Sequence, residues 1–366
     1  TQALGAKEVY LSRSLRVDGS PTVPARWLTR LEFAAQALGL KPAEMTARGS
    51  KWLAWHRDLA LVPPVGVVVS EISDRGRPCP TPPVAARPRK LSVTEVETWM
   101  RDPYAIYARH ILKLRALPPL DQAPDAADYG SRIHHVLDRF LGKCLPGPLP
   151  DEALAQLIEN GSEMLAPIKA LPAVWTFWWP RFQRIAEWFI KTEIARRAGI
   201  AETFTEVAGT LILTSSEGSF ELVARADRID RLSDGRLAII DFKTGAVPRT
   251  AEVVAGFAPQ LPLEAAIAAA GGFENVSPAP VGDLEFWRLS GGRVVGAVSS
   301  VGGNNPVELA VRARAGLAQL IETFDDPATP YESRPRADWA PRYSDYEHLA
   351  RVKEWSAPGA DGGESA

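Results

Sequence analysis

The chain has 366 residues, 46% hydrophobic and 23% charged, which is ordinary for globular proteins and excludes wholesale disorder. The length predicts about two domains. A formal net charge of −2 excludes a general attraction for nucleic acid, so any DNA binding would need local basic patches. Two cysteines, Cys79 and Cys144, exclude a disulfide framework and a four-cysteine metal cluster. We therefore expect a soluble protein of the reducing cytoplasm, with no membrane partner because no apolar run is long enough to span a bilayer.

The first 75 residues predict the edge of another domain. Trp27, Leu31, Ala35 and Leu38 form an amphipathic helical pattern that ends before Gly39. Because the chain starts without methionine or a signal pattern, we interpret it as a piece of a longer chain. A proline-rich stretch at residues 76–90 predicts an extended linker, and the polar tail at residues 356–366 is expected to be disordered.

Residues 91–355 open with four predicted helices. A capping-box pattern at Ser92 and Glu95 starts the first, and Asp102 before Pro103 starts the second. The third covers residues 126–141, and the fourth contains a tryptophan-rich stretch at residues 175–188. The last two carry apolar stripes: Ile133, Val136, Leu137 and Phe140, then Trp178, Phe182, Ile185 and Phe189. Tryptophans can stack on bases, but this helical spacing favours a role in the core.

In the second half of the chain, the spacing of hydrophobic residues changes from that of helices to that of strands. Strands are predicted at residues 204–214, 220–232 and 236–243 and around 283–298, with helices near 251–270 and 307–324. This order predicts an α/β fold with a mixed central sheet flanked by helices.

The most informative pattern is a hairpin around Ser233-Asp234-Gly235, a typical turn sequence. If these three residues form the loop, Asp227 lies opposite Asp241, and such facing residues hold their Cβ atoms about 4.5–5.5 Å apart. Lys243 falls on the same face as Asp241.

Two facing carboxylates repel each other unless a cation lies between them. Carboxylate oxygens favour Mg²⁺ or Mn²⁺, and a neighbouring ammonium can orient or deprotonate a water and neutralise charge on a phosphate. The pattern therefore predicts phosphodiester hydrolysis. The alternative is an exposed hairpin whose aspartates and lysine are solvated or salt-bridged.

These residues resemble the PD-(D/E)xK nucleases of the RecB type. Asp227, then Asp241-Phe242-Lys243-Thr244-Gly245 and Gln260, match the family's motifs, and Gly130 to Leu137, which includes His134, is similar to its first motif. Within this family the chain resembles the C-terminal part of AddB subunits of bacterial AddAB helicase-nucleases. Residues 1–75 then resemble the end of a helicase-like region.

The resemblance implies a restriction-endonuclease-like fold and a set of site residues. The metal ligands would be His134, Asp227, Asp241 and the carbonyl of Phe242, with His135 as the spare histidine. Lys243 would act on the water, and Gln260 would order the lysine or the DNA. The resemblance leaves the roles of two further residues open. Relatives often carry a glutamate at the position of Glu206, which is either functional or a solvated strand residue. Glu264 stands where a tyrosine is common in relatives.

The resemblance also implies a biological role. It implies a Mg²⁺-dependent exonuclease, with Mn²⁺ as an alternative metal, that degrades single-stranded DNA during double-strand break repair beside an AddA-like helicase-nuclease subunit. Asp102 occupies the place of the first cysteine of an iron-sulfur cluster found in many AddB-like nucleases, so we expect no such cluster here. Two alternatives are a non-catalytic scaffold that guides DNA and docks AddA, and a stand-alone exonuclease. Intact motif residues argue against the first, and residues 1–75 argue against the second.

Several basic residues near these motifs are candidates for phosphate contacts, although an ordinary solvated surface is the alternative for each. They are Arg87, Arg89, Lys90, Arg109, Lys113, Arg115, Arg225, Arg228 and Arg231.

Overall fold

The computed structural model describes residues 5, 7–17, 19–60, 77–117, 120, 122–144, 146–301, 303, 305–341 and 343–356. The chain divides into two compact units, Thr1–Val69 and Ser70–Ala366. The predicted disordered tail beyond residue 356 and the segment 61–76 lie outside the described residues. No helix in the described part of the chain is long and apolar enough to cross a membrane.

The described part of the first unit is mainly helical. β1 (Arg16–Val17) pairs antiparallel with β2 (Ser20–Pro21), and α1 (Arg26–Ala37) and α2 (Pro42–Ala60) follow. α1 ends before Gly39, whose φ of 75° is the left-handed conformation typical of a glycine after a helix. The predicted helix is therefore confirmed, while the assignment of this unit to a helicase-like region stays a prediction.

The second unit is built on a mixed six-stranded sheet. Its strands are β3 (Lys90–Ser92), β4 (Ile200–Ser215), β5 (Gly218–Leu232), β6 (Leu237–Lys243), β7 (Val281–Leu289) and β8 (Gly296–Ser300). The order is β3-β5-β6-β7-β8, and β4 pairs with β5. The β3–β5 and β6–β7 pairs are parallel and the others antiparallel, so the predicted mixed sheet is confirmed.

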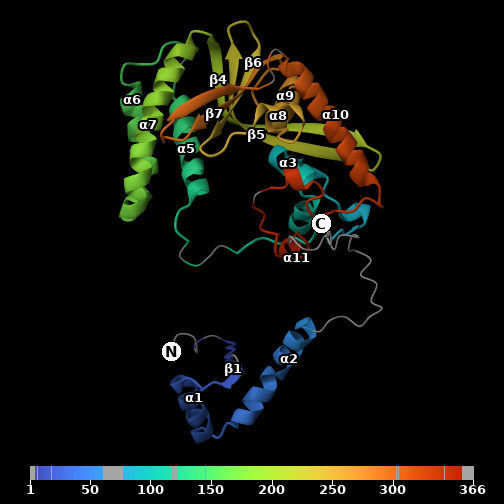
Figure 1. The fold of residues 1–366 in the computed structure, drawn as a ribbon. Coiled ribbons are helices and arrows are strands. Elements are labelled where there is room, and N and C mark those ends of the chain that lie inside the picture. Colours follow the sequence, from blue (N-terminus) through green and yellow to red (C-terminus); the bar gives the residue numbers. More distant parts are fainter. Residues whose placement is uncertain are drawn as a thin grey trace, which may run out of the picture. The chain divides into compact units, whose positions relative to one another are not determined.

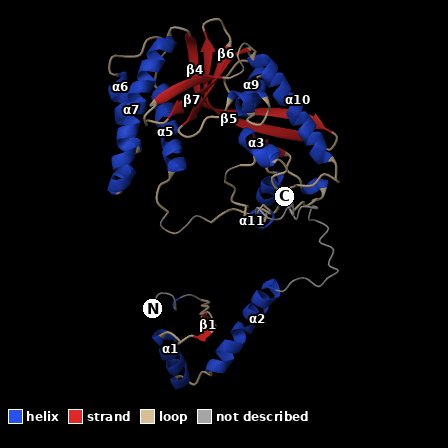
Figure 2. Cartoon of the chain, viewed as in Figure 1, coloured by secondary structure: helices blue, strands red, loops and turns tan. Residues whose placement is uncertain are grey.

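Helices cover both faces of this sheet (Figure 1, Figure 2). On one face lie α5 (Ala126–Leu141), α6 (Ala153–Met164) and α7 (Pro172–Arg197). On the other lie α3 (Val93–Arg101), α9 (Gln260–Ala269) and α10 (Pro306–Asp325). The shorter helices are α4 (Pro103–Ile106), which continues as a π-helix over Tyr107–Ile111, α8 (Thr250–Val254) and α11 (Val352–Trp355).

Two large hydrophobic clusters, one for each helical layer, form most of the core, and a small third cluster contains Tyr104, Ala350 and Val352. The predicted stripe of α5 is buried with that of α7, and Ile240, Phe242 and Trp287 of the sheet complete this cluster. The core role predicted for the α7 stripe is therefore confirmed. The second cluster joins α3, α9 and α10 to the opposite face of the sheet.

Two features of the second unit differ from the sequence expectations. The helix expected near residues 251–270 is two helices, because Gly256 turns the chain between α8 and α9 with a φ of 84°. α6 was not expected, because its Asn160 and Gly161 weaken the helical signal, yet both are buried where the helix packs. An added Cβ at Gly161 would lie 2.0 Å from the Phe182 ring, so glycine permits the close approach of α6 to α7.

The described part of the proline-rich stretch, residues 77–90, packs against the second unit. Pro80 and Pro82 are buried, and the Pro80 carbonyl accepts a hydrogen bond from the Tyr331 N–H. The buried Arg87 donates to the carbonyls of Pro82, Phe324, Asp326 and Pro327. These bonds tie this stretch to the end of α10 and to the chain that follows it.

Candidate active site

The β5–β6 hairpin has the predicted register. Arg228 pairs with Ile240 and Ile229 pairs with Ile239, so the next positions place Asp227 opposite Asp241. The paired ladder stops there because Asp227 Oδ2 accepts a hydrogen bond of 2.7 Å from the Phe242 N–H. Phe242 thus contributes its N–H to the position of Asp227, and the metal-binding role predicted for its carbonyl stays a prediction.

α5 brings His134 to this hairpin. Asp125 caps the helix by accepting from the Ala127 and Asp128 N–H groups, which fixes where α5 begins. A Cβ at Gly130 would lie 2.9 Å from Thr244 Oγ1, so glycine lets the helix approach the end of β6. One turn later, His134 Nδ1 lies 3.2 Å from Asp227 Oδ1. His135 is exposed on the same helix, so the structure brings His134 and not His135 to the aspartate.

Lys243 and α9 complete the site. Lys243 Nζ donates to Asp241 Oδ1 at 2.8 Å and to Gln260 Oε1 at 3.1 Å. Gln260 Nε2 donates to the same Asp241 oxygen at 2.6 Å and lies 3.3 Å from Glu264 Oε1. Gln260 and Glu264 are one turn apart on α9, so both side chains face β6. The structure therefore joins three of the predicted residues, Asp241, Lys243 and Gln260, and the buried Glu264 in one network.

Carboxyl groups crowd this network. Burial, and then the charge of Asp227, raise the pKa of Asp241 to about 6 even though Lys243 lies beside it. Burial and the charges of Asp241 and Asp227 also raise the pKa of Glu264 well above its usual range. Asp241 Oδ2 lies 2.7 Å from Lys243 Nζ, whereas Glu264 Oε2 accepts no hydrogen bond from the described residues. A buried carboxylate oxygen without a donor fits a position that a hard cation would satisfy.

The cations of the site respond to the same charges. Burial lowers the pKa of Lys243, but the carboxylates of Asp241, Asp227 and Glu264 together outweigh this effect, so the net shift is upward and Lys243 is protonated at neutral pH. Burial also lowers the pKa of His134, but the hydrogen bond with Asp227 and the charge of Asp227 raise it. The net shift of the His134 pKa is therefore upward. A protonated lysine suits hydrogen bonding to a water and neutralising charge better than removing a proton.

Glu206 of β4 belongs to the site. Ligand atoms of His134, Glu206 and Asp227 all lie within 4.8 Å of one another, a spacing that a single metal ion can bridge. Asp241 lies outside this group and pairs with Lys243, and the metal-binding role predicted for Asp241 stays a prediction. The structure thus favours the functional alternative for Glu206.

The predicted basic residues differ in what they can reach. Arg228 is fully buried between Glu193 and Asp230, so it cannot contact a phosphate. Arg87 is also buried, and Arg89 pairs with Asp325 at 2.5 Å. Arg225 keeps 70% of its side chain exposed beside Glu206.

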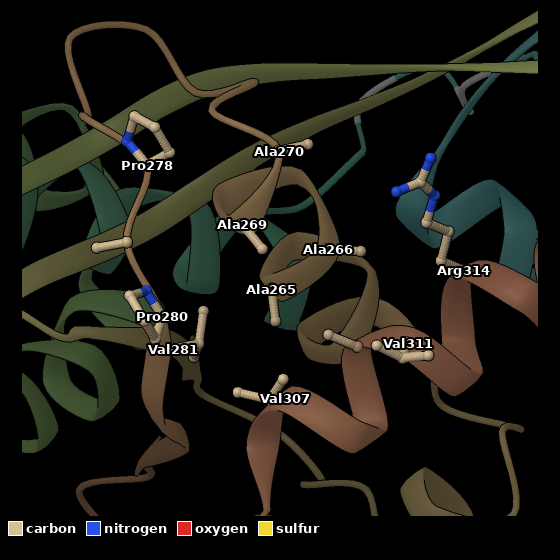
Figure 3. Close-up of a pocket in the computed structure, with 12 residues that line it drawn as sticks. Ala265, Ala266, Ala269, Ala270, Pro278, Pro280, Val281, Val307, Val311 and Arg314 are labelled. Carbon is tan, nitrogen blue, oxygen red and sulfur yellow. The ribbon is translucent and has the colours of Figure 1, made fainter.

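An apolar cavity of about 440 Å³ lies away from this network. It lies between α9, α10 and the chain that enters β7, and Figure 3 shows alanine, valine and proline side chains around it with Arg314 at its edge. None of its lining residues is a carboxylate, histidine or cysteine. Its lining offers no group for acid–base or metal chemistry, so we place the chemistry at the hairpin.

The comparison with known protein families agrees with this geometry. A sequence model of the PD-(D/E)XK nuclease superfamily matches residues 90–343, which is more than two thirds of the chain. A protein of Rickettsia conorii, described as uncharacterized, is 25% identical over 94% of this chain and 41% of its own length. An uncharacterized protein of Rickettsia typhi is 32% identical over 56% of this chain and 24% of its own length.

A third relative, an uncharacterized protein of Rickettsia bellii, is 30% identical over 52% of this chain and 23% of its own length. The chain thus spans less than half the length of each of these relatives. A solved structure titled "Crystal structure of SSO0001" covers 72% of this chain and 87% of its own, at 14% identity and a TM-score of 0.35, which is too low to carry an argument.

Proposed function

The chain belongs to the PD-(D/E)XK nuclease superfamily, and we propose that it is a metal-dependent exonuclease acting on single-stranded DNA. Membership implies a nuclease that hydrolyses phosphodiester bonds, and nucleases of this superfamily use divalent metals. The observation that carries the proposal is that two hydrogen-bonded groups, His134 with Asp227 and Asp241 with Lys243 and Gln260, meet at the hairpin where Asp227 lies opposite Asp241. We further propose Mg²⁺ as the metal, with Mn²⁺ as a substitute, because the oxygen ligands suit both.

The chemistry follows from the positions of these side chains. A bound divalent cation would supply Lewis-acid polarisation of a phosphate oxygen and activate a water. His134, Glu206, Asp227 and Asp241 would hold that cation. Lys243 Nζ, fixed by Asp241 and Gln260, would hydrogen bond to the attacking water and neutralise charge that develops on the phosphate. Gln260 keeps the lysine in place because its amide contacts both Lys243 and Asp241.

The biological role in the proposal is that of an AddB-like subunit. The resemblance to AddB at Leu91 to Leu114, Pro259 to Leu263 and Tyr346 to Trp355 supports it, and the greater length of the Rickettsia relatives is compatible with a larger protein. In this role the chain would degrade one strand that an AddA-like helicase-nuclease has unwound in the cytoplasm, during repair of double-strand breaks.

Cleavage of an end-labelled single strand, with Mg²⁺, Mn²⁺ or EDTA, tests the nuclease activity. Asp241→Asn keeps an oxygen for Gln260 and removes the charge, while Lys243→Met leaves the carboxylates in place. We expect both to lower the cleavage rate at least about 100-fold, and calorimetry should show weaker Mn²⁺ binding for Asp241→Asn only.

His135→Ala is the matched control, because His135 adjoins His134 but is exposed, and it should cleave at the wild-type rate. Near wild-type cleavage by Asp241→Asn, in protein of unchanged melting temperature, would refute the assignment of the active site.

A further inference from the structure

Arg225 is an exposed arginine at the edge of the candidate active site. It lies on β5 two residues before Asp227, and 70% of its side chain is exposed. The other two arginines of this strand that were candidates for phosphate contacts are engaged: Arg228 is buried between carboxylates, and Arg231 donates to the Ser277 carbonyl at 2.9 Å. Among these three, Arg225 is the one whose charge faces solvent beside the site.

Glu206 holds this arginine. Arg225 Nε lies 2.8 Å from Glu206 Oε2, and this carboxylate also belongs to the group with His134 and Asp227. The Glu206 carboxylate therefore contacts the Arg225 guanidinium and also lies where it could bind a metal ion. Because a carboxylate that binds a divalent cation attracts a guanidinium less, the two partners compete for Glu206.

The backbone aims Glu206 at this position. Thr205 pairs with Arg228 and Val207 pairs with Ala226, so Glu206 faces Asp227 but has no partner in the ladder. Its φ of 50° is left-handed, which is unfavourable for a residue with a side chain and is typical of functional sites. The irregularity thus places a carboxylate next to Asp227 at some conformational cost.

Room for a ligand lies beside the pair. A cavity of about 440 Å³ is lined by Thr205, Glu206, Arg225, Glu274 and Asn275, among others. This volume is within the range of pockets that bind small ligands and admits a nucleotide unit. Arg225 is the cation of this cavity, so a phosphate is the group that it would attract.

We propose that Arg225 binds a backbone phosphate of the DNA strand next to the one being cleaved, and that Glu206 restrains it until Glu206 ligates a divalent cation. The inference rests on the proposed nuclease function and adds a phosphate site to it. Released from Glu206, the guanidinium presents its paired N–H groups to phosphate oxygens, a geometry that arginine provides and lysine does not. Strand binding is then coupled to metal binding through two residues of neighbouring strands.

Binding of a labelled single strand, followed by fluorescence anisotropy in EDTA or in Ca²⁺, tests the proposal without relying on cleavage. Arg225→Ala should weaken binding about five-fold in Ca²⁺ and less than two-fold in EDTA, because Glu206 holds the arginine only without the cation. Arg225→Lys should recover part of the loss. Arg312→Ala is the matched control: Arg312 is also exposed and paired with a glutamate, Glu308 on α10, and its loss should change binding in neither condition.

A second variant tests the restraint. Glu206→Gln frees Arg225 and should tighten binding in EDTA by a few-fold, and the gain should disappear in the double variant with Arg225→Ala. Equal losses for Arg225→Ala in EDTA and Ca²⁺ would overturn the restraint, and a loss no larger than that of Arg312→Ala would overturn the phosphate site. A wild-type protein that shows the expected binding pattern but cuts no DNA in Mg²⁺ or Mn²⁺ would refute the nuclease function and leave the phosphate site supported.

Discussion

Asp102 shows how one buried carboxyl group depends on its surroundings. It ends α3, is buried, and its Oδ1 accepts a hydrogen bond of 3.2 Å from the Arg334 N–H. Burial raises its pKa above the ordinary value of 3.8, although Arg334 acts in the opposite direction. This position therefore joins the start of the nuclease domain to the chain after α10 by a hydrogen bond.

We predict that Asp102→Asn stabilises the protein increasingly as the pH rises. A carboxyl group whose pKa is higher in the folded state makes its full contribution to stability at a pH below its pKa in the unfolded state, 3.8. This contribution is lost as the pH rises through the pKa of the folded state. Asparagine does not titrate, so the melting temperature of the variant relative to wild type should rise by roughly 1–3 °C between pH 4 and pH 7.

Calorimetry at both pH values checks this prediction. Asp151→Asn, at an exposed aspartate, is the control and should show no such trend. If the melting temperature of Asp102→Asn relative to wild type instead fell between pH 4 and pH 7, the fold would favour the ionised carboxylate of Asp102.

The sequence predicts those site residues whose positions are determined by a hairpin register or by a motif. The turn at Ser233 to Gly235 correctly placed Asp227 opposite Asp241. The same rule, applied to a turn at residues 216–217, places Glu206 opposite Asp227, as the β4–β5 pairing has it. The sharing of Glu206 with Arg225 and the burial of Glu264 were not predictable, because both depend on which side chains the α9 layer and a strand irregularity bring together.

At the scale of elements, a buried ionic network attaches α7 to the sheet. Arg228 of β5 makes two hydrogen bonds to Glu193 of α7, at 2.7 and 3.0 Å, and one to Asp230, at 2.8 Å. Arg196 of α7 bridges Asp230 to Glu285 of β7. These charged side chains have little exposure to water, so each is stable in the interior only because partners of opposite charge lie beside it. The apolar stripe of α7 predicted its packing face, whereas its charged residues gave no sign that they would be buried.

We predict that Arg228→Met destabilises the protein by about 3–5 kcal/mol, because it leaves Glu193 and Asp230 buried with fewer positive partners. Denaturant unfolding measures the change. The double variant with Glu193→Met should recover part of the loss, since it removes one of the uncompensated charges. Arg312→Ala, which breaks an exposed pair on α10, should cost less than about 1 kcal/mol. A loss of similar size for Arg228→Met and Arg312→Ala would mean that the network contributes little.

At the scale of the whole molecule, the two units differ in how much core they contain. Both hydrophobic clusters and the candidate active site belong to the second unit. In the described part of the first unit, Ala35 is the buried apolar residue, while Trp27, Phe33 and Trp52 are exposed. Large exposed apolar side chains are typical of surfaces that another protein covers. This contrast is compatible with the prediction that residues 1–75 belong to a larger domain.

We therefore predict that a chain starting at residue 77 folds and cleaves as the 366-residue chain does. Its melting temperature should lie within about 2 °C of that of the 366-residue chain, since the first unit adds little buried apolar surface. Its cleavage rate on a single strand should agree within about two-fold, because every residue assigned to the site follows residue 77. The shortened chain should also self-associate less, as light scattering would show, because the exposed tryptophans are gone. A large fall in melting temperature would instead mean that the first unit is part of the folding core of the second.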